Sequence, residues 1–324
     1  MRKFLIKLSL FVIPLILISY GADYFISGVL KKSQSFADSE YPVWNALFNG
    51  DINADVVIYG SSRAFRHVDP TIMADSLKVP VYNLGVNGHS FRTEYFRHYL
   101  LLKNCRKPKL ILQTLDVVTF EKASDLYNQD QFLPYMLCNK EIEEHEYNGF
   151  SKLDYEVPMM RYFGKKEALI EVIKLLLFRS SNRPVRTNGY AGQELTWTND
   201  LSKAQNDFGS MEIVSDTSII HLFESYIKDC QRLKIPVIFV YTPEYIEGQK
   251  FVTNRSDIFE IYNHLSSKYN IPFFDYSKDS ISYHKELFYN SGHLNKTGAE
   301  IFTKKLIGDL RRHNITAKLK TPSI

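Results

Sequence analysis

The 324-residue sequence has few cysteines and little net charge. Its three cysteines, Cys105, Cys138 and Cys230, are odd in number and form no CxxC or Cys/His pattern. A disulfide framework or a metal site is therefore not expected. We favour three buried free thiols, with one accidental pair as the alternative. The net charge of +4 comes from interspersed charges without a basic block, which argues against a nucleic-acid partner. No sequence pattern indicates a cofactor.

One long uncharged apolar run does occur, at residues 8–21, directly after three basic residues within the first seven positions. Basic residues followed by such a run are typical of an export signal or a signal anchor. Residues 4–21 nearly reach the roughly 20 apolar residues that a membrane span needs. Because Ser19-Tyr20-Gly21 is a poor cleavage site, we favour an uncleaved anchor within residues 1–32 over a cleaved signal. The basic flank places the rest of the chain outside the cytoplasm.

Beyond residue 33, short apolar runs alternate with helical patterns. The expected strands are residues 54–60, 79–85, 108–116, 235–243 and 271–275. The expected helices are residues 70–77, 90–104, 217–233, 256–269 and 295–313. This alternation predicts an α/β fold, a three-layer sandwich with a mostly parallel sheet covered by helices on both faces.

The alternation stops between residues 120 and 216, where the sequence is polar and rich in Asn, Tyr and Glu. One clear helical pattern lies inside this segment, at residues 165–178. We therefore predict an α/β domain over residues 33–324 that carries an inserted subdomain at residues 120–216.

Ser61 and Ser62 follow the first expected strand, at the end of the sheet where α/β proteins form their sites. Serines at this position often cap the following helix, so capping is one interpretation. The other is nucleophilic catalysis, for which a serine hydroxyl needs a base. His293 lies just before the last expected helix, and histidine suits that role near neutral pH. A lone histidine can also be structural.

The segment "YNLGVNGHS" follows the second expected strand and contains Gly85, Asn87 and Gly88. Glycines at such a strand end let backbone N–H groups approach a substrate oxygen closely. An ordinary Gly/Asn turn has the same composition.

Together, "GSSR" at residues 60–63, "NLGVNG" at residues 83–88 and "NSGHLNKTG" at residues 290–298 resemble three sequence blocks of the SGNH/GDSL hydrolase superfamily. The resemblance covers roughly residues 55–116 and 236–307. It implies a flavodoxin-like sheet, with Ser62 as nucleophile and His293 as base. It also implies an oxyanion hole formed by the backbone N–H of Ser62 and by Gly85, with Gly88 as the next match.

Two positions depart from the family pattern. The family has an Asp three residues before the catalytic His, whereas this chain has Asn290. An Asn carbonyl can accept the hydrogen bond from the ring but brings no charge. Asp275 and Asp279 are alternatives from nearby in the chain. The third block of the family carries an oxyanion-hole Asn, whereas the matching strand end offers Asp116, which leaves Asn87 as a candidate donor.

The three blocks and the apolar N-terminus resemble most the membrane-anchored bacterial members that modify cell-surface glycans, including relatives of the teichoic-acid D-alanyl transfer protein and of polysaccharide O-acetyltransferases. The resemblance implies a single-pass protein of the bacterial cell membrane with an extracytoplasmic catalytic domain. Its activity would be that of a serine esterase or O-acyltransferase on a surface polysaccharide, with a membrane acyl donor as a further partner. Arg63, Asp116 and Tyr241 are the expected substrate-binding residues.

A second hypothesis is that the chain has the same fold but no catalytic activity. Asn290 and the missing third-block Asn would then mark a catalytically inactive glycan-binding or polysaccharide-assembly protein. The sequence separates neither these two hypotheses nor hydrolysis from acyl transfer, because both reactions share an acyl-enzyme. It also leaves the acyl group and the glycan undefined.

Overall fold

A computed structural model describes residues 1–88, 91–121, 128–145, 149–178 and 185–320. The chain divides into two compact units. Residues 1–45 and 128–185 form the first unit, and residues 46–127 and 186–324 form the second. The expected insertion at residues 120–216 stays a prediction, and its residues 186–216 cluster with the second unit.

The second unit is built on a five-stranded, fully parallel sheet in the order β2-β1-β3-β4-β5. The strands are β1 (Val56–Tyr59), β2 (Val81–Asn83), β3 (Leu110–Leu115), β4 (Val237–Tyr241) and β5 (Phe273–Asp275). All five lie inside the predicted strand ranges, which confirms the parallel α/β sheet. Strands buried on both faces read as unbroken apolar runs, which is why their positions could be recognised in the sequence.

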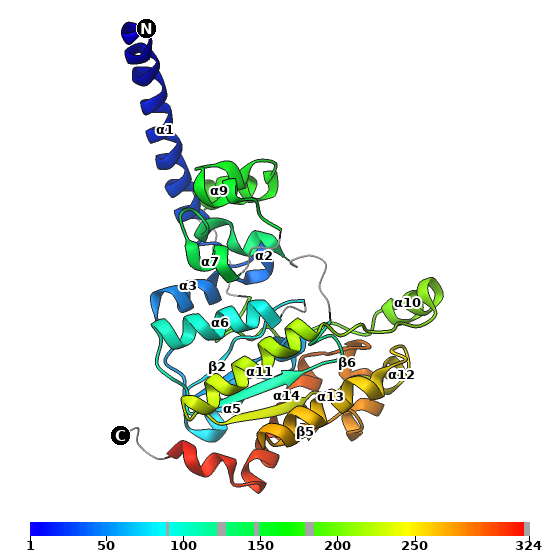
Figure 1. Cartoon of the computed structure of the whole chain (residues 1–324). Coiled ribbons are helices and arrows are strands. Elements are labelled where there is room, and N and C mark those ends of the chain that lie inside the picture. The colour runs from blue at the N-terminus through cyan, green and yellow to red at the C-terminus, as the bar shows by residue number, and fades with distance from the viewer. Residues whose placement is uncertain (89–90, 122–127, 146–148, 179–184, 321–324) are drawn as a thin grey trace. The chain divides into compact units, whose positions relative to one another are not determined.

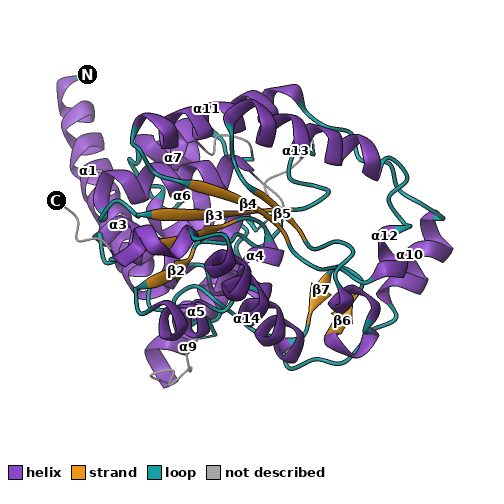
Figure 2. Cartoon of the chain, turned by 90° about the horizontal axis from the view of Figure 1, so that it is seen from below, coloured by secondary structure: helices purple, strands orange, loops and turns teal. Residues whose placement is uncertain are grey.

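Helices cover both faces of this sheet (Figure 2). One face carries α4 (Ser62–His67), α5 (Pro70–Leu77) and α14 (Lys296–Arg312), and the other carries α6 (Phe91–Asn104), α11 (Thr217–Arg232) and α13 (Arg255–Tyr269). Successive residues of a strand pack on opposite faces of the sheet, each against the helices that cover that face. Val56 and Ile58 of β1 pack on the α14 side, whereas Tyr59 packs edge-on against Tyr226 of α11 on the other side. The predicted three-layer sandwich is confirmed.

A small hairpin before α14 was not expected from the sequence. It consists of β6 (Phe288–Asn290) and β7 (His293–Leu294), which pair antiparallel with Asn290 opposite His293. Strands of three and two residues are too short to show a periodic pattern, so the sequence analysis placed His293 in a polar loop. The other short elements of this unit are α10 (Asp200–Phe208), α12 (Ile246–Gln249), η3 (Ser280–Tyr283), η4 (Lys285–Leu287) and η5 (Ile315–Lys320).

The first unit contains α1 (Arg2–Leu30), the one helix among the described residues that is long and apolar enough to cross a membrane. Its side chains are exposed over most of its length, but Asp23 and Ser27 near its end are buried. Asp23 forms a buried ion pair with Arg161 at 2.6 Å. The unit also contains α2 (Phe36–Ser39), η1 (Gln129–Tyr135), α7 (Lys140–His145), α8 (Lys152–Glu156), η2 (Met160–Tyr162) and α9 (Lys166–Phe178), whereas α3 (Tyr41–Asn49) runs from the first unit into the second.

Helix α9 lies beside α1 (Figure 1) and matches the helix predicted at residues 165–178. The three cysteines are free, as predicted, but only Cys230 is buried. Cys138 is exposed and Cys105 is half-buried, which corrects the expectation that all three lie in the core.

Gly60 ends β1 with φ +137°, in the region of backbone space that favours glycine. A Cβ at this position would lie 1.9 Å from Thr114 Oγ1 and 3.1 Å from Ala64 Cβ. We expect Gly60→Ala to lower the free energy of unfolding by about 1–3 kcal/mol, because the strand end must shift to make room. Chemical denaturation of the full-length protein in detergent measures this change.

Gly308 provides the matched control, because a Cβ there would meet nothing within 4 Å inside α14. Gly308→Ala should raise the free energy of unfolding by about 0.5–1 kcal/mol. Equal losses for the two variants would contradict the steric account of Gly60.

Candidate active site

The turn between β1 and α4 gives its two serines different tasks. Ser61 is the N-cap of α4, and its Oγ accepts a hydrogen bond from Arg63 N–H at 3.2 Å. The same hydroxyl donates to the carboxylate of Asp116 at the end of β3. Ser62 is the first residue of the helix, so its side chain is not needed for the cap. The capping interpretation therefore applies to Ser61 and leaves the hydroxyl of Ser62 available for chemistry.

Ser62, His293 and Asn290 form a continuous hydrogen-bonded chain. Ser62 Oγ lies 2.7 Å from His293 Nε2, although the two residues are 231 positions apart in the sequence. His293 Nδ1 lies 2.9 Å from Asn290 Oδ1 across the β6–β7 hairpin. Both Ser62 and His293 are half-buried. This is the geometry of a serine nucleophile, its base and a group that orients the base.

The amide of Asn290 is held in one orientation. Its Oδ1 also accepts a hydrogen bond from the backbone N–H of Gly292 at 3.1 Å. If the amide turned round, its NH₂ group would face the N–H of Gly292, donor against donor, so the turned orientation is unfavourable. With Oδ1 facing the ring, Nδ1 of His293 carries the proton and the lone pair of Nε2 faces the Ser62 hydroxyl. This is the tautomer that a general base needs.

His67 of α4 holds the hairpin in place. Its Nε2 accepts a hydrogen bond from the backbone N–H of Leu294 at 3.0 Å, and its Nδ1 donates to Thr242 Oγ1 at 2.8 Å. Burial, aided by the nearby Arg63, lowers the pKa of His67 well below its ordinary value, so the ring stays neutral. The sequence analysis missed this residue, and its only signal there is a histidine on the helix that follows the nucleophile.

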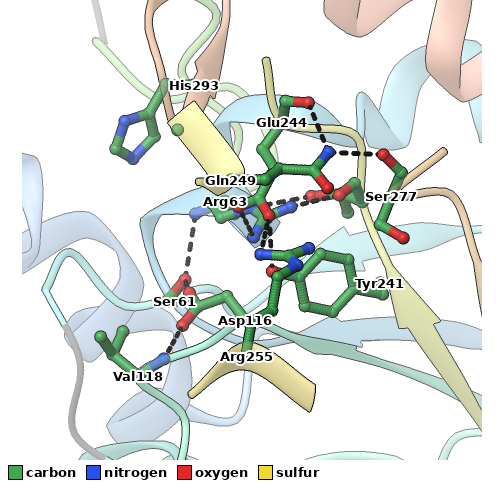
Figure 3. Close-up of polar contacts among 12 residues, drawn as sticks. Ser61, Arg63, Asp116, Val118, Tyr241, Glu244, Gln249, Arg255, Ser277 and His293 are labelled. Atoms are coloured by element: carbon green, nitrogen blue, oxygen red, sulfur yellow. Dashed lines mark hydrogen bonds and ion pairs between the residues drawn. The ribbon is translucent and has the colours of Figure 1, made fainter. Parts of the chain in front are cut away.

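Arg63 and Tyr241 lie in a cluster of polar side chains with Glu244 and Arg255 (Figure 3). Arg63 donates to Glu244 at 3.1 Å and to Thr242 Oγ1 at 3.1 Å, and its guanidinium lies 4.6 Å from the centre of the Tyr241 ring. Tyr241 OH donates to Glu244 at 3.0 Å, and Arg255 forms a further ion pair with Glu244. Arg63 is 4% exposed and Tyr241 is fully buried, so neither lies at a substrate-facing surface. This placement differs from the expectation that both bind substrate.

Asp116 also supports the turn. Its carboxylate accepts hydrogen bonds from Ser61 Oγ and from Val118 N–H at 2.8 Å (Figure 3). Its backbone carbonyl accepts one from Tyr262 OH. Both carboxylate oxygens are thus engaged as acceptors, and the side chain is buried. Asp116 therefore neither replaces the third-block Asn nor faces the substrate side.

Asp275 and Asp279 do not take the place of Asn290. Asp275 accepts a hydrogen bond from Ser277 N–H, and Asp279 caps η3 and forms an ion pair with Lys305 at 3.1 Å. The partner of the His293 ring is the neutral amide of Asn290.

Gly85 has a packing role in this structure. Its N–H donates to Asn83 Oδ1 at 2.9 Å, so this donor is already engaged. A Cβ on Gly85 would lie 2.6 Å from the backbone nitrogen of Phe65, which shows how closely the β2 end packs on α4. The following Val86 N–H donates to Gly60 O at 2.8 Å and brings Asn87 and Gly88 beside the turn.

The surroundings of His293 disfavour its protonated form. Burial, together with the positive charges of Arg66 and Arg63, lowers the pKa of His293 to about 3. The Tyr289 ring stacks on the imidazole with 5.4 Å between ring centroids and 13° between planes. His293 is thus neutral and able to accept a proton at neutral pH, but the imidazolium that would form during catalysis is poorly stabilised.

Comparisons with known proteins give only distant similarity. No protein-family model matches this chain, and no curated protein matches it. Among solved structures, the acetyl xylan esterase AlAXEase is similar over 79% of this chain and 99% of its own, at 14% identity and a TM-score of 0.40. A lipolytic protein of the G-D-S-L family from Desulfitobacterium hafniense is similar over 79% and 99%, at 11% identity and a TM-score of 0.34.

An acetyl xylan esterase from the rumen bacterium Butyrivibrio proteoclasticus is similar over 81% of this chain and 64% of its own, at 11% identity and a TM-score of 0.35. With TM-scores of 0.40 or less, none of these similarities bears on the chemistry of the site.

The protonation state of His293 can be measured without any substrate. In imidazole ¹⁵N spectra of the full-length protein in detergent, we expect the His293 signals, assigned by their loss in His293→Ala, to show the neutral Nδ1–H tautomer down to about pH 4. This follows from a pKa of about 3. Asn290→Asp should raise that pKa by about 1–3 units, because a carboxylate beside the ring favours the imidazolium. A wild-type His293 that titrates between pH 6 and 7 would contradict this description of the site.

Proposed function

We propose that this protein is a serine esterase or O-acyltransferase that acts through an acyl-enzyme on Ser62. The observation that carries this proposal is the hydrogen-bonded chain from Ser62 Oγ through the His293 ring to Asn290, with contacts of 2.7 and 2.9 Å. Because Ser61 caps α4, the contact between the Ser62 hydroxyl and the oriented imidazole has no part in the cap. The proposal covers both hydrolysis and transfer because the first half of the two reactions is the same.

In the first half-reaction, Ser62 Oγ attacks the acyl carbonyl carbon while His293 Nε2 takes the hydroxyl proton. The tetrahedral intermediate then collapses. The bond from the carbonyl carbon to the leaving alcohol breaks, and His293 returns its proton to that alcohol's oxygen. The acyl group remains as an ester on Ser62, and the imidazole is again neutral.

Backbone N–H groups would stabilise the oxyanion. Ser62 is the first residue of α4, so its N–H has no acceptor within the helix and lies at the positive end of the helix dipole. Because Gly85 N–H is engaged by Asn83, we assign the second donor to residues 87–88, which follow the Val86–Gly60 hydrogen bond. Gly88 has φ +84°, which lets a backbone N–H turn toward the nucleophile without a side chain in the way.

In the second half-reaction, His293 Nε2 takes the proton of an incoming hydroxyl, whose oxygen attacks the acyl-Ser62 carbonyl carbon. The bond from that carbon to Ser62 Oγ then breaks, and His293 returns the proton to Ser62 Oγ. If the hydroxyl belongs to water, the product is a free acid, and if it belongs to a sugar, the product is a new ester. We propose acyl esters of a cell-surface polysaccharide as the substrate. The resemblance of residues 60–63, 83–88 and 290–298 to glycan-modifying proteins supports this, as does the apolar helix α1.

The first test is covalent labelling of the full-length protein with a fluorophosphonate, read by mass spectrometry. Labelling should occur on Ser62 and be lost in Ser62→Ala, and His293→Ala should slow it by at least about 100-fold because the base is gone. The exposed Ser256→Ala serves as the matched serine control and should label like wild type. Asn290→Asp should raise turnover of a model acetyl ester by stabilising the imidazolium. Labelling no faster than that of Ser62→Ala would remove the proposal.

The alternative function is that of a catalytically inactive glycan-binding or assembly protein. The neutral Asn290 and the cationic surroundings of His293 are the observations that favour it. In that case polysaccharide binding would survive both Ser62→Ala and His293→Ala, and no ester would be turned over even in Asn290→Asp.

We further propose that the first unit sits at the membrane, with α1 as its span. Helix α9 buries Ala168 and Val172 but leaves Ile170, Ile173 and Leu177 exposed at helical spacing, by 47, 54 and 69%. Exposed apolar side chains on one helix face are typical of helices that lie in the membrane interface. Because α9 packs beside α1 in the same compact unit, a bilayer crossed by α1 is within reach of this face.

A photoreactive phospholipid tests this placement in the full-length protein reconstituted into nanodiscs. Adducts should map to α9 as well as to α1. The double substitution Ile173→Asp and Leu177→Asp should remove the α9 adducts, because charges are expelled from the apolar layer, while α1 adducts remain. Glu167→Gln, on the same helix, is the control and should keep them. Adducts confined to α1 in the wild type would refute the interfacial role of α9.

A further inference from the structure

Arg66 brings a positive charge to the catalytic imidazole. It lies on α4 four residues after Ser62, so both side chains occupy the same face of the helix, one turn apart. Its guanidinium carbon lies 4.8 Å from the centre of the Phe65 ring and 5.8 Å from that of Tyr289. The Tyr289 ring in turn stacks directly on His293.

Arg63 and Arg66 differ sharply in how their charges are compensated. Arg63 is paired with Glu244 and donates two further hydrogen bonds to Thr242. Arg66 forms no salt bridge with any residue in the described part of the chain, and its Nε is buried without a hydrogen-bond partner there. Asp200, at the start of α10, acts electrostatically on Tyr289 but is not paired with Arg66. The Tyr289 side chain forms a hydrogen bond with Arg66, but a guanidinium offers five donors, and Nε is one that has no partner in the described part of the chain.

The position of this charge needs an explanation, because it opposes the proposed chemistry. A cation near His293 makes the imidazolium of the acylation step harder to form. A bound anion would cancel the charge of Arg66 and remove that opposition. A substrate that carries an anionic group would therefore ease formation of the His293 imidazolium. A neutral ester would leave the charge of Arg66 uncompensated.

We propose that Arg66 is a specificity residue that binds an anionic group of the substrate. This group is a carboxylate or phosphate that the glycan carries close to the scissile ester. This inference rests on the proposed function, because it names the class of ester that the Ser62–His293 site takes. The planar guanidinium binds such groups through two parallel hydrogen bonds, which also fixes the ester relative to Ser62. The anion both orients the substrate and compensates the charge beside the base.

Kinetics with matched esters test the inference. The substrates are the O-acetyl esters of methyl glucoside, methyl glucuronide and glucose 6-phosphate, used with the full-length enzyme in detergent. Wild-type kcat/KM should be at least about tenfold higher for either anionic ester than for the neutral one. Arg66→Gln should lower kcat/KM for the anionic esters about tenfold or more, and should raise kcat for the neutral ester. Arg66→Lys should restore only part of the preference, because it lacks the planar fork.

The two anionic esters distinguish a carboxylate site from a phosphate site. A site for a sugar carboxylate should prefer the glucuronide ester, and a site for a phosphate should prefer the glucose 6-phosphate ester. Arg232→Gln, an exposed arginine on α11, is the control and should keep the wild-type preference. Equal turnover of neutral and anionic esters by the wild type, or a preference that survives Arg66→Gln, would overturn the inference while the proposed function stands.

A binding measurement keeps the inference testable if no ester is turned over. In the Ser62→Ala variant, methyl glucuronide or glucose 6-phosphate should shift the ring signals of His293, and methyl glucoside should not. Adding Arg66→Gln should weaken binding of the charged sugar by about tenfold or more. Shifts that persist without Arg66, or that no charged sugar produces, would refute the anion site.

Discussion

The candidate site depends on a contact between the hairpin β6–β7 and helix α4, which begins at Ser62. His67 Nε2 accepts a hydrogen bond from the backbone N–H of Leu294, the residue next to His293, and His67 Nδ1 donates one to Thr242, which follows β4. This neutral, buried ring ties three separate chain segments together. This contact contributes to the placement of His293 Nε2 2.7 Å from Ser62 Oγ, 231 positions away in the sequence. A positioning residue can therefore be as important to the base as its direct hydrogen-bond partner.

The proposed base, His293, combines good geometry with unfavourable electrostatics. Gly292 fixes the amide of Asn290, so the ring is held in the productive tautomer without a carboxylate. The amide provides no negative charge to stabilise the imidazolium. The positive charges of Arg66 and Arg63 destabilise it further. Orientation and charge stabilisation, which one Asp supplies together in most serine hydrolases, are separated in this chain. An anionic substrate group at Arg66 would supply the missing charge from outside the protein.

The polar residues around the nucleophile fall into two groups. Asp116, Arg63, Tyr241 and Glu244 are buried and hydrogen-bonded to one another or to the turn, and they stabilise its shape. Ser62, His293 and Arg66 are only half-buried and carry the groups that a substrate can meet. Satisfied buried networks rigidify a site, whereas incompletely paired charges are where ligands bind.

The sequence by itself determined the sheet, the covering helices, the apolar N-terminal helix and the candidates Ser62 and His293, because burial imposes a strong periodicity and strand ends are marked by glycines and polar residues. It also identified Asn290, whose partner is only three residues away. Only the tertiary structure decided that Ser61 rather than Ser62 caps α4, that Gly85 N–H is engaged, and that Arg63 and Tyr241 are buried. Those outcomes depend on contacts between residues far apart in the chain, such as Arg63 with Glu244 and His67 with Leu294, and no local pattern encodes which neighbour a side chain will meet.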